Sequence, residues 1–120
     1  MGSKTTLTRE AILAVSDLPQ VEIKVPEWGG MVIVTCLSGK DLAAWQDLHG
    51  EGIKTGTEGL KVMTSLIVRC VVDDKGERLF SNADVDALMA KGAKVLSRVF
   101  NAALKVNAVT RAEVEVLEKN

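Results

Sequence analysis

The sequence contains few of the residues that metal sites and disulfide scaffolds need. Its 120 residues include two cysteines, one histidine and no tyrosine. Cys36, Cys70 and His49 together supply at most three ligands, one fewer than a structural zinc site requires. Two cysteines so far apart in the chain are also too few for a disulfide scaffold. We therefore expect both to be free, buried thiols in a reducing cytosol.

Long apolar segments and an excess of charge of one sign are also missing. The longest nearly apolar run, residues 66–72, is interrupted by Arg69 and is far too short to span a bilayer. The first ten residues are polar and lack the apolar stretch of a signal peptide. Fifteen basic and sixteen acidic residues give a net charge of −1, so bulk electrostatics do not attract nucleic acid. We expect a soluble, cytoplasmic protein that does not bind membranes.

Signatures of catalysis are scarce as well. The sequence has no Gly-x-Ser-x-Gly motif and no glycine-rich phosphate loop, and Cys36 falls within a strand pattern. His49 ends a predicted helix, where a protonated imidazole complements the helix dipole, so we assign it a capping role. Residues 73–77 superficially resemble a calcium loop, but the third position is Lys75 and the twelfth is Asp84. We expect no catalytic, metal or cofactor-binding residues and no enzymatic activity.

The composition that remains is that of one ordinary globular domain. Hydrophobic residues make up 47% of the chain and charged residues 26%. A chain of 120 residues is long enough to bury one core, and it shows no internal repeat or dividing linker. We predict a single domain over residues 1–120.

A β-hairpin is predicted near the N-terminus. Residues 21–25 alternate strictly, which places Val21, Ile23 and Val25 on one face of a strand. Residues 26–30 contain a proline and two glycines and predict a turn, and the β-branched residues of 31–37 predict the second strand. A lone hairpin is unstable in water, so helices must cover its apolar face.

Helical periodicity and helix-start signals predict the other elements. Ser38, Thr55 and Ser81 each stand three residues before an acidic residue, in the manner of a capping box. We predict helices over residues 8–15, 41–49, 58–72, 83–90 and 94–106, and a last one opening at Thr110. The segment 66–72 is alternatively a strand. The predicted fold class is α+β, with an N-terminal β-hairpin packed on a helical domain of about four to six helices.

A DNA-binding role is one alternative. The helices predicted over 83–90 and 94–106 can be drawn as a helix-turn-helix, with Lys94, Arg98, Asn101 and Lys105 as a polar stripe on the second. Any surface helix shows such a stripe, however, and the near-neutral charge supplies little attraction for phosphates. Nucleic acid is therefore the weaker interpretation.

The two tryptophans call for different interpretations. Trp28 lies in the predicted hairpin turn, where it either folds back onto the domain or anchors a partner. Trp45 recurs with Leu42 and Leu48 at helical spacing, so we assign it to the core.

Several motifs together resemble a known family. The segment VEIKVPEWGGMVIVTCLSGKDLAAWQ places a Pro-Glu-Trp-Gly-Gly hairpin before a Leu-Ser-Gly helix start. The segment VVDDKGERLFSNADVDALMAKGAKVLSRVFNAALKVN then combines an Asp-rich turn, Arg-Leu-Phe, a short acidic helix and an amphipathic helix. Over about residues 21–107 this arrangement resembles the tail assembly chaperones of long-tailed bacteriophages and prophages.

The resemblance implies a non-enzymatic role in the host cytoplasm. Proteins of this family are thought to coat the apolar tape measure protein, keep it soluble and help to recruit tail tube subunits. They leave before the virion is complete, and many are made in two forms through ribosomal frameshifting. The present chain would correspond to the short form.

We expect partners to contact the hairpin and the central helix. Our candidates for partner binding and weak self-association are Trp28, Met31, Ile33, Leu60 and Met63. We expect an apolar groove between the hairpin and the helix over 58–72, and an exposed edge on the strand over 31–37 that pairs with a second copy. The alternative function is that of a structural tail or head–tail connector protein, or of a small DNA-binding regulator.

Overall fold

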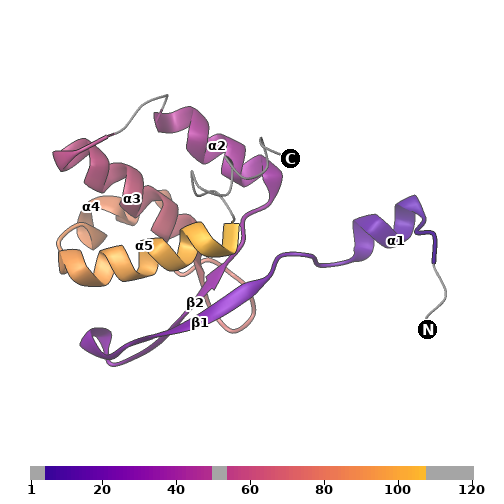
Figure 1. Cartoon of the computed structure of the whole chain (residues 1–120), viewed down its shortest axis with the longest axis horizontal. Coiled ribbons are helices and arrows are strands. Elements are labelled where there is room, and N and C mark those ends of the chain that lie inside the picture. The colour runs from indigo at the N-terminus through magenta and orange to yellow at the C-terminus, as the bar shows by residue number, and fades with distance from the viewer. Residues whose placement is uncertain (1–4, 50–53, 108–120) are drawn as a thin grey trace, which may run out of the picture.

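The computed structural model describes residues 5–49 and 54–107, which form a three-stranded antiparallel sheet and five α-helices (Figure 1). This arrangement confirms the predicted α+β class. The elements are α1 (Arg9–Ala14), β1 (Gln20–Val25), the 3-10 turn η1 (Pro26–Trp28), β2 (Gly30–Thr35), α2 (Gly39–His49), α3 (Gly56–Cys70), β3 (Val71–Val72), the 3-10 turn η2 (Asn82–Asp84), α4 (Val85–Leu88) and α5 (Ala93–Asn107). The connection at 50–52 and the helix predicted from Thr110 lie outside the described residues.

The hairpin forms where the alternation predicts it. Strands β1 and β2 pair antiparallel, with Val21 opposite Val34 and Val25 opposite Gly30. At the tip, Gly29 adopts a φ of 85°, a left-handed conformation that a residue with a side chain rarely takes. Alternate residues of a strand point to the same face of the sheet, so Val21, Ile23 and Val25 lie together on one side.

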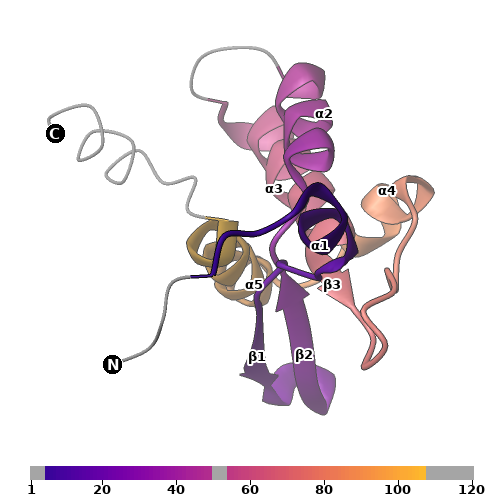
Figure 2. The same cartoon turned by 90° about the vertical axis from the view of Figure 1, so that its right-hand side faces the viewer.

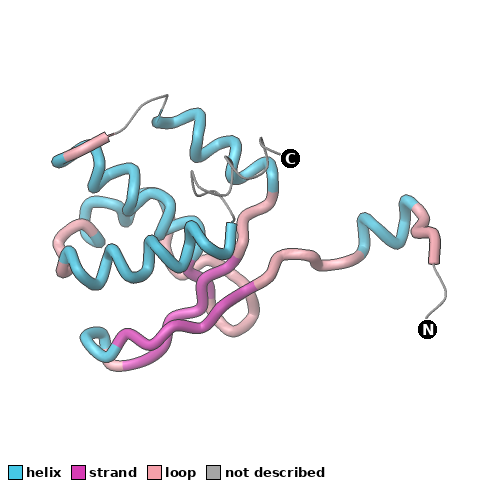
Figure 3. The backbone as a smooth tube through the Cα atoms, viewed as in Figure 1, coloured by secondary structure: helices cyan, strands magenta, loops and turns pink. Residues whose placement is uncertain are grey.

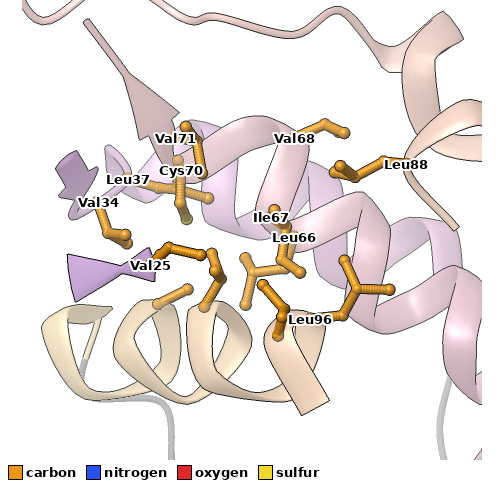
Figure 4. Packing of buried hydrophobic residues seen from close by; sticks show 13 residues of the cluster. Val25, Val34, Leu37, Leu66, Ile67, Val68, Cys70, Val71, Leu88 and Leu96 are labelled. Carbon is orange, nitrogen blue, oxygen red and sulfur yellow. The ribbon is translucent and has the colours of Figure 1, made fainter. Parts of the chain in front are cut away.

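Helix α5 covers this apolar side of the hairpin, as the hairpin requires. Leu96, Val99 and Ala103 of α5 are buried, and they meet the buried Val25 and Val34 in one hydrophobic cluster (Figure 4). Helix α3 packs on α5 and supplies the centre of this core, with Leu66, Ile67, Val68 and Cys70 fully buried. Helix α5 therefore packs against both the hairpin and α3, while α3 leads directly into the sheet through β3 (Figures 1 and 2).

Helix α3 ends two residues before the predicted boundary of 58–72. Val71 and Val72 form β3, and they pair with Val34 and Ile33 of β2. The alternative of a strand over 66–72 is thus right for its last two residues only. Both residues are β-branched, and a neighbouring strand is within reach, so sheet pairing stops the helix.

The predicted capping residues have different outcomes. Ser81 and Asp84 form a capping box, in which the Ser81 N–H donates to Asp84 Oδ2 over 2.8 Å. Thr8 accepts a hydrogen bond from the Ala11 N–H at the start of α1. Thr55 precedes α3 but makes no side-chain capping bond, so the capping box predicted there is wrong. The helix predicted over 83–90 is also shorter, since only Val85–Leu88 is α-helical.

Helix α1 stands apart from the rest of the molecule on an extended arm (Figures 1 and 3). None of its residues is buried. The exposed apolar side chains in and around it are Leu7, Ile12, Leu13, Val15 and Leu18. These apolar side chains therefore have no partner within the described part of the chain.

Candidate functional site

Three helices surround an apolar groove of about 530 Å³. Trp45 and His49 come from α2, Leu60 and Met63 come from α3, and Phe100 comes from α5. Leu60 and Met63 are half-buried because their spacing of three residues puts both at the boundary of the α3 core stripe. The groove thus offers aromatic and flexible aliphatic side chains, a lining that suits an apolar helix.

A hydrogen-bond network fixes the α2 wall of this groove. Trp45 Nε1 donates to Ser65 Oγ over 2.9 Å, and the Ser65 hydroxyl donates to the Val62 carbonyl over 2.8 Å. His49 Nε2 lies 2.8 Å from Ser65 Oγ, and its ring meets the Trp45 ring edge-on at 5.6 Å. Trp45 packs against the hydrophobic cluster, which confirms its assignment to the core, whereas Leu48 is 63% exposed.

His49 lies in the last turn of α2, as predicted, and its ring contacts Ser65 of α3. Burial and the nearby charges of Arg69 and Lys54 lower the pKa of its imidazole. A lowered pKa favours the neutral ring, which shares a hydrogen bond between Nε2 and Ser65 Oγ. His49 therefore holds α2 against α3.

The five predicted contact residues separate into two groups. Leu60 and Met63 line the groove, while Trp28, Met31 and Ile33 belong to the hairpin. The groove described here lies between helices α2, α3 and α5, and not between the hairpin and α3 as predicted, because α5 packs against both the hairpin and α3.

On the hairpin, Met31 and Ile33 lie on the face that α5 leaves uncovered. Their cross-strand partners on β1 are Lys24 and Glu22. Met31 is 55% exposed, and Ile33 is half-buried. Trp28 is half-buried and packs against the hydrophobic cluster, which favours the folded-back interpretation. Helix α1 lies at the other end of the molecule from the hairpin tip and does not cover Trp28 (Figure 1).

Strand β2 is paired on both sides only at Ile33 and Val34, which corrects in part the exposed edge predicted for residues 31–37. The order of the sheet is β1-β2-β3, and the two residues of β3 pair with these two residues of β2. The long unpaired edge belongs to β1 instead (Figure 2). The sequence did not indicate this second partner of β2, because β3 directly follows α3 in a segment predicted as helix.

The polar stripe of α5 contributes to an internal ion pair. Both Arg98 guanidinium nitrogens donate to the Glu27 carboxylate, at 2.7 and 2.8 Å. These hydrogen bonds lower the pKa of Glu27 to about 2. The pair joins α5 to the hairpin tip, and α4 has only four residues. Both observations argue against a helix-turn-helix that uses Arg98 to bind DNA.

The cysteines and the Asp-rich turn show ordinary structural roles. Both Cys36 and Cys70 are free; Cys70 is buried, which raises its pKa to about 11, and Cys36 is half-buried. Asp73 Oδ1 accepts hydrogen bonds from the N–H groups of Lys75 and Glu77, so it stabilises its own turn. No cluster of three metal-ligating side chains occurs in the described ranges 5–49 and 54–107.

Sequence reasoning missed two features of these surfaces. Phe100 of α5 is half-buried and lines the groove, and it was not among the predicted contact residues. The exposure of the α1 arm was not predicted either. Its five large apolar residues between Leu7 and Leu18 are exposed, although apolar residues are usually buried.

Comparisons with known proteins give a consistent result. The model of the family described as "Phage tail assembly chaperone" matches residues 8–119. A solved structure of the bacteriophage HK97 tail assembly chaperone shares the fold, with a TM-score of 0.60 and 22% sequence identity. The match covers 74% of this chain and 85% of the HK97 chain. A search of curated proteins gave no significant match.

Proposed function

The chain belongs to the phage tail assembly chaperone family, and on this premise we propose that it binds the tape measure protein of its phage and keeps it soluble. Membership indicates a non-catalytic role in tail assembly, with other proteins as partners. A tape measure protein is long and apolar before the tail tube surrounds it. A chaperone without an energy source needs only an apolar surface of its own to cover such a partner.

The groove between α2, α3 and α5 is the observation that carries this proposal. Its lining of Trp45, Leu60, Met63 and Phe100 accepts the apolar stripe of an amphipathic helix. Lys54 lies at the same groove, and Glu58 and Lys61 lie on the adjoining surface. Charges of both signs at the margin match the polar flanks of such a helix.

The α1 arm offers a second apolar surface to the same partner. Its exposed side chains project on a segment that extends away from the core. Two separated apolar surfaces on one chaperone contact two segments of a long partner and thereby strengthen weak individual contacts.

We further propose weak self-association and a transient role in the host cytoplasm. Many copies are needed along an extended tape measure protein, and they leave when tail tube subunits polymerise around it. None of the helices in residues 5–49 and 54–107 has the length and apolar character needed to cross a membrane.

Co-expression with fragments of the tape measure protein of the same phage tests the binding proposal. The chain should raise the soluble yield of at least one fragment and co-purify with it. Leu60→Glu should reduce the recovered fragment at least about tenfold, because it puts a charge into the apolar groove. Leu79→Glu, the same substitution at a position that is 56% exposed and outside the groove, is the matched control and should retain binding.

Two outcomes would contradict the proposal. One is that no fragment co-purifies with the folded chain; the other is that Leu60→Glu remains folded and binds as well as the control. Mass spectrometry of purified virions tests the transient role, since a stoichiometric signal would instead identify a structural tail or connector protein.

A further inference from the structure

We propose that β1 pairs antiparallel with β1 of a second copy, in the register that places Glu22 opposite Lys24 of the other copy. The inference deepens the proposed self-association and is independent of tape measure binding. It starts from the sheet order, in which β1 is an outer strand whose far side meets no other described element (Figure 2).

The orientation of the β1 amides follows from the hairpin register. The Cys36 N–H donates to the Pro19 carbonyl over 2.8 Å, just before the first strand pair, Gln20 and Thr35. Hydrogen-bonded and non-hydrogen-bonded pairs alternate along antiparallel strands. Three pairs of β1 and β2 residues therefore exchange hydrogen bonds: Val21–Val34, Ile23–Val32 and Val25–Gly30. The N–H and C=O groups of Gln20, Glu22 and Lys24 point outward.

Several antiparallel registers would join the outward N–H and C=O groups of two β1 strands, and the charges of Glu22 and Lys24 favour one of them. A two-fold axis at Ile23 places Glu22 opposite Lys24 of the second copy, twice per dimer. Sliding the strands in one direction places Glu22 opposite Glu22, and sliding in the other places Lys24 opposite Lys24. Parallel pairing in register also opposes like charges. Opposite charges on directly opposed residues stabilise a sheet, and like charges destabilise it.

Charged residues on an edge strand commonly prevent pairing, but these two are self-complementary. Glu22 and Lys24 lie on the same face two positions apart and are both exposed. An antiparallel copy of the strand presents the opposite sequence of charges. The charges of this edge are therefore complementary to those of its own antiparallel copy.

The apolar side of β1 is also incompletely covered at this edge. A hollow of about 400 Å³ lies between Val21 and Ile23 of β1 and Asn101 and Ala102 of α5. Val21 is 40% exposed although it is on the core side of the hairpin. Pairing about Ile23 brings Ile23 and Val25 of the second copy beside these side chains, which removes apolar surface from water.

The prolines limit the pairing to one short ladder. Pro19 and Pro26 flank β1, and neither has an N–H to donate. Because the ladder is short, we expect a weak dimer.

Sedimentation velocity on the whole purified chain tests the pairing through reversals of charge. The unmodified chain should form a dimer at low salt between micromolar concentration and about 1 mM. Glu22→Lys and Lys24→Glu should each raise the dissociation constant at least about tenfold, since each converts two attractive pairs into two repulsive ones. The double variant should recover dimerisation, and an equimolar mixture of the two single variants should form a heterodimer.

Matched controls separate the register from net charge. Glu77→Lys and Lys75→Glu make the same charge changes in an exposed turn and should leave the dissociation constant unchanged. A mass of one chain at every concentration would overturn the inference. So would an oligomer that withstands both single reversals, or a double variant that stays monomeric. None of these results bears on capture of tape measure fragments, which is measured separately.

Discussion

At the scale of single residues, the effect of replacing a leucine on stability should depend on how deeply that leucine is buried. Leu96 of α5 is fully buried between α3 and the hairpin, whereas Leu48 of α2 is 63% exposed. We expect Leu96→Ala to lower the free energy of unfolding by about 2–5 kcal/mol, because it removes buried apolar contacts and leaves a cavity. Leu48→Ala, the same chemical change, should stay within about 0.5 kcal/mol of the unmodified chain. Urea denaturation measures both, and equal effects would contradict this core.

The ion pair between Glu27 and Arg98 makes stability depend on pH. The folded chain holds the pKa of Glu27 at about 2, below the value of 4.5 for an unperturbed carboxyl. The unfolded state therefore takes up a proton first, so the contribution of the pair is present above about pH 4.5 and is lost as the pH falls toward 2. The melting temperature of Glu27→Gln should be lower than that of the unmodified chain at pH 6, and the difference should shrink over that window.

Salt and a second glutamate are the controls for this prediction. Both side chains of the pair are partly exposed, so 1 M salt should reduce the difference at pH 6. Glu77→Gln, in the exposed turn after β3, should not reproduce the pH-dependent difference. A difference for Glu27→Gln that persists to pH 2 would contradict the assignment to the ion pair.

At the scale of elements, α1 is expected to contribute almost nothing to the stability of the chain. Its Leu13 is 68% exposed, and none of its residues is buried. Ile12→Asp should therefore change the free energy of unfolding by no more than about 0.5 kcal/mol. Ile67→Asp, the same change at a fully buried position of α3, should prevent stable folding because it buries an unpaired carboxylate. Thermal melts of both variants decide the matter.

The binding role proposed for α1 is tested by measuring how well Ile12→Asp recovers a tape measure fragment. Ile12→Asp should reduce recovery of a tape measure fragment while leaving the melting temperature unchanged. A variant that melts normally and binds normally would remove α1 from the proposed binding surface, and the groove would remain.

The elements could be predicted from the sequence where local signals decide them. Alternation predicted β1, and helical periodicity predicted helices over 58–72 and 94–106, which the structure shows as α3 and α5. The end of α3 depended on a strand distant in sequence, so Val71 and Val72 were assigned to the helix. Asn107 illustrates the same limit: its Oδ1 accepts from the Leu37 N–H over 2.7 Å, a contact across 70 residues.

The candidate site was predicted only in part for the same reason. Local spacing identified Trp45, Leu60 and Met63 as apolar positions at which helices meet their neighbours. The helix that packs against both the hairpin and α3 is decided by long-range contacts, and the sequence did not indicate that it would be α5. The two charges that specify the β1 edge were visible in the sequence, but the unpaired side of β1 was not.

At the scale of the whole molecule, burial predicts an order of local opening. The centre is the second half of α3, where Leu66, Ile67, Val68 and Cys70 are fully buried, and the periphery is α1. Amides in the best-packed elements exchange only through global unfolding, whereas exposed elements open locally. Native-state hydrogen exchange should therefore be slowest in α3, close behind in α5 and fastest in α1. Protection of α1 equal to that of α3 would mean that the arm is covered.

Native-state hydrogen exchange also distinguishes the β1 amides that face β2 from those that face outward. In dilute protein, the amides of Val21, Ile23 and Val25 should be protected because they bond to β2, while those of Glu22 and Lys24 exchange freely. Raising the protein concentration should then protect Glu22 and Lys24 selectively, because only the outward amides gain partners from a second copy. Lys24→Glu should abolish this concentration dependence and leave the protection of Ile23 intact. Protection that rises equally at all five positions would instead indicate a general tightening of the hairpin and would contradict pairing through the free edge.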